Sequence, residues 1–246
     1  MSFTFKQFHI ADSRCAMKVG TDGVLLGAWA DVSQAHHVLD IGCGSGLISL
    51  MAAQRQPEAH VTAIELDASA ALDARENVAR SPFSDRIEVV EADVVKWAAD
   101  SAQRGRFDCV ISNPPYYEED LLPPSQLRAQ ARHTAGGGLT FAALLRSVRL
   151  LLHDDHEYSS PTSRPSTFSV ILPSQAQPRF CALAAIHGLN LTRRTDIVTR
   201  LSKPCKRVLL EFSPTARPLT HSVLTLLGDG SSRSAEYQAL CEDFYL

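Results

Sequence analysis

Four consecutive residues, Asn113-Pro114-Pro115-Tyr116, could together bind a flat group that carries an amino function. They follow the apolar stretch 107–112, which predicts a buried strand, so we expect them at the carboxyl end of that strand. Asn113 offers a side-chain carbonyl acceptor, and the prolines stiffen the turn while their carbonyl oxygens stay available. Tyr116 adds an aromatic face. The same residues could instead form only a rigid turn that ends the strand.

A glycine-rich loop lies between an earlier predicted strand and a predicted helix. It reads D-x-G-x-G-x-G, with Asp40, Gly42, Gly44 and Gly46 at the named positions. Glycines in such a loop let the backbone turn tightly and approach a ligand. The spacing differs from the G-x-G-x-x-G loop that presents a helix N-terminus to a pyrophosphate. Asp40 could pair with a cationic amino group, although the loop could also be purely structural.

Acidic residues follow the next two predicted strands. Glu65 ends the strand 61–65, where a carboxylate can accept hydrogen bonds from ribose hydroxyls. Asp93 follows the strand 87–90 and could bind the amino group of an adenine, or could cap the helix that begins at Val94. Together the glycine loop, Asp40 and these two acids suit a ligand that consists of a nucleoside with an amino-acid tail and no phosphate. S-adenosylmethionine has this composition.

The elements that must position these residues alternate along the chain of 246 residues. Buried strands are predicted at 38–41, 61–65, 87–90, 107–112 and 168–172, with helical patterns between them. Such alternation is typical of an α/β fold with a mostly parallel sheet. We expect one domain over residues 1–212, with a flexible insertion at about 153–167. Residues 213–246 form an extension that packs on the domain or trails from it.

Composition limits the function classes. The net charge is −3, so any binding of nucleic acid must depend on a local basic patch. The six cysteines include no C-x-x-C pair, which argues against a metal site. No apolar run approaches the roughly 20 residues of a membrane span. We therefore expect a cytoplasmic protein without metal or membrane attachment, and a monomer.

The order of these motifs resembles the class I, Rossmann-like methyltransferases that use S-adenosylmethionine. Asn-Pro-Pro-Tyr after the fourth strand resembles the subset that methylates exocyclic or amide nitrogens. Residues 5–10 and 18–30 are similar to the start of the bacterial tRNA1(Val) adenine-N6 methyltransferases, and the resemblance extends over about residues 3–212. It implies a seven-stranded, mostly parallel sheet with helices on both faces. It also implies methylation of adenosine 37, on the 3′ side of the anticodon of a valine tRNA.

The resemblance suggests a role for each site residue. We expect the side-chain oxygen of Asn113 and the carbonyl oxygen of Pro114 to accept the two amino hydrogens of adenine, and Tyr116 to stack on the base. Thr21 and Asp22 are expected in the cofactor site with the glycine loop and the two acids.

The tRNA anticodon stem-loop requires cations, which this acidic chain must concentrate. The alternatives are a guanine-N2 enzyme of ribosomal RNA, a protein glutamine enzyme, or a non-catalytic nucleotide-binding module. The residues that we expect to contact RNA are Lys18, Arg132, Arg194, Arg200, Lys203 and Lys206.

Overall fold

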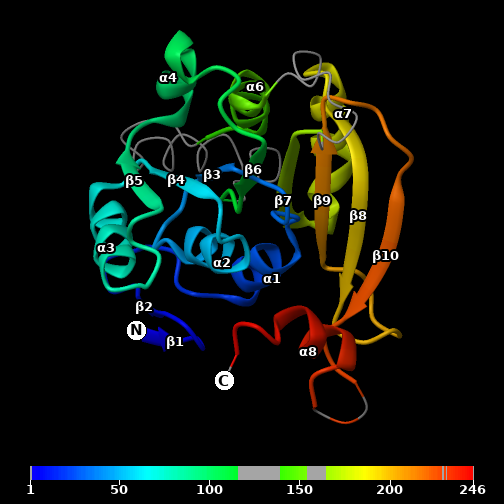
Figure 1. Ribbon diagram of the computed structural model, residues 1–246. Coiled ribbons are helices and arrows are strands. Elements are labelled where there is room, and N and C mark those ends of the chain that lie inside the picture. Colours follow the sequence, from blue (N-terminus) through cyan, green and yellow to red (C-terminus); the bar gives the residue numbers. More distant parts are fainter. Residues whose placement is uncertain (1, 116–138, 154–164, 229, 231, 246) are drawn as a thin grey trace, which may run out of the picture.

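The computed structural model describes residues 2–115, 139–153, 165–228, 230 and 232–245. Its main sheet has eight strands in the order β10-β8-β9-β7-β6-β3-β4-β5 (Figure 1). Strands β7, β6, β3, β4 and β5 are parallel, β9 is antiparallel to both of its neighbours, and β10 is parallel to β8. The bounds are β3 (His37–Ile41), β4 (His60–Glu65), β5 (Ile87–Glu91), β6 (Cys109–Ser112), β7 (Thr167–Pro173), β8 (Asn190–Val198), β9 (Arg207–Ser213) and β10 (Thr220–Thr225).

Helices cover both faces of this sheet (Figure 1). On one face α1, α2, α3 and α8 enclose a core that also includes the N-terminal segment. On the other face α4, α6 and α7 enclose a second core. The helices are α1 (Thr21–Trp29), α2 (Leu47–Arg55), α3 (Ala68–Ala79), α4 (Val94–Ala99), α6 (Phe141–Leu151), α7 (Gln177–Ile186) and α8 (Ala235–Cys241).

Local sequence explains why these elements begin where they do. The central strands are short apolar runs, as expected for parallel strands that are covered on both faces. Four helices start at a side chain that accepts a hydrogen bond from the first turn. Asp67 accepts from Ala70, Asp93 from Val95, Thr140 from Ala143 and Ser234 from Tyr237. The elements around the predicted site are therefore determined largely by local signals.

The register of the parallel strands aligns their carboxyl ends. Ile41 lies opposite both Ile64 and Ser112, and Glu65 lies opposite Glu91. The segments that follow these strands therefore meet along one side of the sheet, which we call the carboxyl edge. In open α/β sheets ligands bind at this edge.

The C-terminal segment differs most from expectation. A sheet of seven strands was expected, and the count is wrong because β10, within residues 213–246, pairs with β8 as an eighth strand. The α8 helix then packs on the same face of the sheet as α1, and Tyr237 and Phe244 become part of the core on that face. The insertion expected at 153–167 lies mainly outside the described residues.

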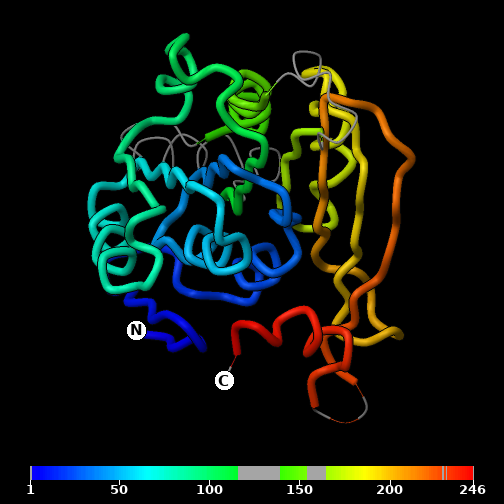
Figure 2. Tube along the Cα trace, viewed as in Figure 1, coloured from blue at the N-terminus to red at the C-terminus, as the bar shows by residue number. Residues whose placement is uncertain are grey.

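The two ends of the chain lie side by side (Figure 2). Residues 2–11 form a small hairpin of β1 (Ser2–Thr4) and β2 (His9–Ala11). The N–H of Lys6 donates to the carbonyl oxygen of Phe244 at 2.9 Å. The ring centroids of Phe3 and Phe5 lie 6.1 and 6.2 Å from that of Tyr245. The tail thus covers the N-terminal aromatic side chains.

Candidate active site

The loop between β3 and α2 turns at three glycines. Gly42, Gly44 and Gly46 have φ values of 72°, 54° and 82°, a region in which other residues are strained. The N–H groups of Gly42 and Cys43 donate to the carbonyl oxygen of Ile64 at 2.8 and 3.0 Å. The glycine loop is thereby held against the end of β4, with its backbone at the carboxyl edge.

Glu65, the last residue of β4, connects the glycine loop to the start of α3. Its Oε2 accepts from the N–H of Gly44 and its Oε1 from the N–H of Asp67, both at 2.9 Å. Each carboxylate oxygen has two lone pairs and can accept a second hydrogen bond. Glu65 can therefore hold the glycine loop and still accept from the hydroxyls of a ligand.

Asp40 is fully buried beneath the glycine loop. Ser49 in α2 donates to Oδ2 at 2.6 Å, whereas no described group donates to Oδ1. Burial, with a smaller contribution from the charge of Glu65, raises the pKa of Asp40 to about 7, against the lowering effect of the Ser49 hydrogen bond. An unpaired buried carboxylate is costly, so the site favours a cationic or hydrogen-donating partner.

Asp93 caps α4, which is the structural alternative to adenine binding that the sequence left open. Its Oδ1 accepts from the N–H of Val95 at 2.9 Å.

Two large apolar side chains stand exposed beside the strand-end acids. Leu66 directly follows Glu65 and is 62% exposed, and Val95 is 42% exposed. Neither residue belongs to a motif, although an apolar residue one or two positions after each acid is a visible signal in the sequence. They offer apolar surface for a planar ring next to hydrogen-bond acceptors.

Asn113 directly follows β6 at the same edge. The preceding Ser112 donates from Oγ to the carbonyl oxygen of Ile41 at 2.9 Å, which ties the end of β6 to the start of the glycine loop. The Nδ2 of Asn113 donates to Sδ of Met17 at 3.7 Å. A side chain from the segment before α1 therefore contacts the residue that we expected to bind the methyl acceptor.

The remainder of the Asn-Pro-Pro-Tyr motif is only partly described. Pro114 is buried and Pro115 is half-buried. Tyr116 and Arg132 lie outside the described residues, so their expected roles stay predictions.

Thr21 and Asp22 begin α1. Thr21 is exposed. The Oδ2 of Asp22 accepts from Nε of Arg207 at 2.8 Å, which pairs the start of α1 with the start of β9. The sequence does not predict this pairing, because the contact joins segments that are far apart in the sequence.

Two of the arginines expected to bind RNA have intramolecular partners. Arg194 lies within β8 and pairs with Asp196, with Nε and Oδ1 2.6 Å apart. Arg200 donates to the carbonyl oxygen of Gly228 at 2.8 Å and also to that of Gly230. These contacts give both arginines a structural role.

The expected lysines are exposed. Lys18 donates from Nζ to the carbonyl oxygens of Asp12 and Ser13 within its own segment. Lys203 and Lys206 lie in the connection 199–206, which follows β8 at the carboxyl edge. The structure thus places two exposed cations on the same side of the sheet as Asn113.

The described part of the chain contains neither a candidate membrane span nor a candidate group of metal ligands. There, no helix is long and apolar enough to cross a membrane. Nor do three or more His, Cys, Asp or Glu side chains of those residues group as metal ligands would.

Comparison with known proteins identifies relatives over the whole chain. Residues 15–132 match the family model described as Methyltransferase small domain. The chain is 43% identical over 245 residues to the tRNA1(Val) (adenine(37)-N6)-methyltransferase of Klebsiella pneumoniae subsp. pneumoniae, covering 99% of this chain and 94% of that protein. A protein of the same name from Bacteroides thetaiotaomicron is 40% identical, with coverage of 99% and 97%.

A solved structure shares the fold. The crystal structure of a predicted O-methyltransferase from Agrobacterium tumefaciens superposes with a TM-score of 0.69 at 23% identity, covering 91% of this chain and 96% of that one. This likeness bears on the fold alone, and it confirms the expected Rossmann-like class. The identity to the curated relatives extends over nearly the full length of both chains, and on that basis this chain belongs to the family of tRNA1(Val) (adenine(37)-N6)-methyltransferases.

Proposed function

We propose that this protein transfers a methyl group from S-adenosylmethionine to N6 of adenosine 37, next to the anticodon of a valine tRNA. One observation carries the proposal: the chain matches relatives of this name over 99% of its length. The geometry agrees with it, because Asn113 of the Asn-Pro-Pro motif lies at the carboxyl edge with the glycine loop. The tRNA anticodon stem-loop is the substrate.

The residues at the edge fit this cofactor. The unpartnered Oδ1 of Asp40 supports an ammonium group nearby, and Glu65 has lone pairs for ribose hydroxyls. Leu66 and Val95 supply apolar surface for the adenine, and Asp93 supplies an acceptor. When bound, S-adenosylmethionine supplies an electrophilic methyl group on a positively charged sulfur.

The protein must activate the amino nitrogen of adenine, which accepts the methyl group. The amino nitrogen of adenine is a weak nucleophile, because its lone pair is delocalised into the ring. Asn113 accepts one amino hydrogen at its side-chain oxygen and Pro114 accepts the other at its carbonyl, so the lone pair turns out of the ring plane. Tyr116 stacks on the base, which is swung out of the anticodon loop. Holding the two reactants in line accounts for much of the remaining acceleration.

The RNA contacts come from exposed cations at the carboxyl edge. Lys203 and Lys206 bind phosphates on the side of the sheet where Asn113 lies, and Lys18 binds a further phosphate. Arg132, outside the described residues, adds a fourth RNA-binding cation. Arg200 acts by shaping the neighbouring C-terminal loop through its bonds to Gly228 and Gly230, rather than by binding phosphate directly.

The test is transfer of a labelled methyl group to transcripts of valine tRNA, followed by nucleoside analysis. We expect N6-methyladenosine in the natural transcript and none when adenosine 37 is replaced by guanosine. Asn113→Ala should lower transfer by about a hundredfold or more while cofactor binding persists. Formation of N2-methylguanosine, or methylation of protein glutamine only, would overturn the proposal.

A further inference from the structure

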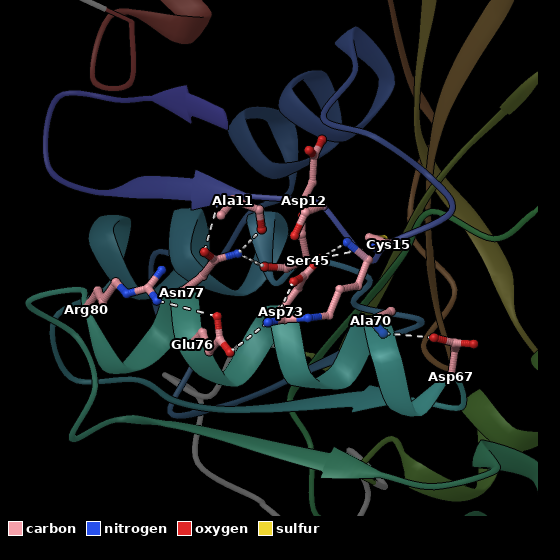
Figure 3. A network of polar contacts seen from close by, with 12 residues as sticks. Ala11, Asp12, Cys15, Ser45, Asp67, Ala70, Asp73, Glu76, Asn77 and Arg80 are labelled. Atoms are coloured by element: carbon pink, nitrogen blue, oxygen red, sulfur yellow. Dashed lines mark hydrogen bonds and ion pairs between the residues drawn. The ribbon is translucent and has the colours of Figure 1, made fainter. Parts of the chain in front are cut away.

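A pair of buried polar residues on α3 holds the N-terminal segment against the active site (Figure 3). Asp73 and Asn77 are each only 1% exposed. They lie one helical turn apart, so their side chains share one face of α3. That face is directed at the chain before α1 and at the glycine loop, not at solvent. A helix rich in alanine would not need either polar group for its own stability.

Asn77 joins three backbone segments. Its Oδ1 accepts from the N–H of Ala11 at 2.9 Å, and its Nδ2 donates to the carbonyl oxygen of Ala11 at 2.8 Å. The same Nδ2 donates to the carbonyl oxygen of Ser45, inside the glycine loop, at 2.9 Å. One amide therefore ties the end of β2 and the glycine loop to α3.

Asp73 binds the next residues of the same segment. Its Oδ2 accepts from the N–H groups of Arg14 and Cys15 at 2.7 and 3.0 Å. Its Oδ1 accepts from the guanidinium of Arg14 at 2.8 Å. A buried carboxylate is tolerated only when it is paired and hydrogen-bonded, and these three donors meet that condition.

The N-terminal segment that Asp73 and Asn77 hold contacts both the glycine loop and Asn113 of the catalytic motif. Cys15 packs on the glycine loop so closely that a Cβ on Gly44 would lie 3.2 Å from its Sγ. Two residues later, Met17 accepts from the amide of Asn113. The N–H of Val19 donates to Oδ2 of Asp12 at 3.0 Å and closes the segment on itself. Residues 11–19 thus connect α3 with the glycine loop and with the catalytic motif.

We propose that Asp73 and Asn77 are positioning residues for methyl transfer: they fix the N-terminal segment and the glycine loop in one arrangement, and so place Cys15 against Gly44 and Met17 against Asn113. The effect on transfer rests on the function proposed above, whereas the effect on cofactor binding and on local order does not. The pair would act without touching cofactor or tRNA.

The test compares Asn77→Ala and Asp73→Asn with the matched control Arg80→Ala. Arg80 is the capping residue directly after α3 and is 63% exposed, and its ion pair with Glu76 is 3.4 Å long. Asp73→Asn keeps the shape of the side chain and one acceptor oxygen, so it provides a folded variant if Asn77→Ala does not fold. Hydrogen exchange, calorimetric binding of S-adenosylmethionine without RNA, and kcat and KM would be measured for each.

We expect both variants to speed exchange at the amides of residues 11–15 and to weaken cofactor binding by about tenfold. The kcat should fall while the KM for tRNA stays unchanged, and Arg80→Ala should match the wild type in every measurement. A lower melting temperature with unchanged cofactor affinity would overturn the proposal and leave Asp73 and Asn77 as structural residues. If the wild type methylates no tRNA, exchange and cofactor binding still decide the role of the pair.

Discussion

Arg207, at the start of β9, donates from Nε to Oδ2 of Asp22, the second residue of α1, at 2.8 Å. Because Arg207 lies opposite Pro173, the last residue of β7, this ion pair sits at the carboxyl edge. The two side chains are 37% and 29% exposed, so the pair contributes at most about 1 kcal/mol to folding. Its importance lies in where it holds Asp22.

The two members of this pair should differ in their effect on cofactor binding. Arg207→Ala is expected to lower the free energy of unfolding by about 0.5–1 kcal/mol and to change cofactor affinity by no more than about twofold. Because we assign Asp22 to the cofactor site, Asp22→Asn should weaken binding by about tenfold. Calorimetry and urea unfolding measure the two effects. Equal losses of affinity would place Asp22 outside the cofactor site.

The buried Asp40 should make stability depend on pH. Burial raises its pKa from 3.8 to about 7, so between these values the folded state keeps a proton that the unfolded state has released. The free energy of unfolding contributed by Asp40 therefore falls as the pH rises from about 4 to about 7, by on the order of 4 kcal/mol, and stays level above. Asp40→Asn should remove this slope in urea unfolding. An unchanged slope would contradict the raised pKa.

Arg200 and Lys203 are expected to separate structural from RNA-binding roles. Arg200→Ala removes two hydrogen bonds to the loop around Gly228 and should cost about 1 kcal/mol of unfolding free energy. Lys203→Ala should leave stability unchanged but reduce the slope of log Kd against log salt by about 0.7, the value for one phosphate contact on a single strand. Binding of tRNA titrated with salt measures this slope. If Arg200→Ala reduced this slope more than Lys203→Ala did, Arg200 would be a direct phosphate contact.

Neighbouring arginines in β8 should contribute very differently to stability. Arg193 stacks on Trp29 at 3.6 Å from the ring centroid and pairs at 2.8 Å with Glu211, which is only 5% exposed. Arg193→Ala leaves that carboxylate without its counter-charge, with only the hydroxyl of Thr192 still donating to it, and should cost about 3 kcal/mol.

The control for this variant is Arg194→Ala. Arg194 is 30% exposed and pairs with Asp196, so its replacement should cost no more than about 1 kcal/mol. Adding Glu211→Gln to Arg193→Ala should recover part of the loss, because the unpaired charge disappears. Similar losses for both single variants would show that burial of Glu211 does not matter.

The parts of the site that could be predicted from the sequence are those that follow strands. Gly42, Gly44 and Gly46 after β3, Glu65 at the end of β4 and Asn113 after β6 each come directly at the end of a short apolar run. Parallel strands bring such residues to one edge whatever the details of packing. The order of the motifs was therefore sufficient to place them together.

The sequence by itself thus determined the α/β class, the carboxyl edge and the strand-end residues on it, because these follow from local apolar patterns and chain order. Tertiary structure alone decided the roles of Asp73 and Asn77, which resemble solvated residues of an alanine-rich helix until residues 11–15 pack on them. It also decided that β10 joins the sheet: the short polar run Thr220–Thr225 has a mostly exposed pattern, and only pairing with β8 makes it a strand. Contacts between distant segments leave no periodic signal in either partner, so packing must reveal them.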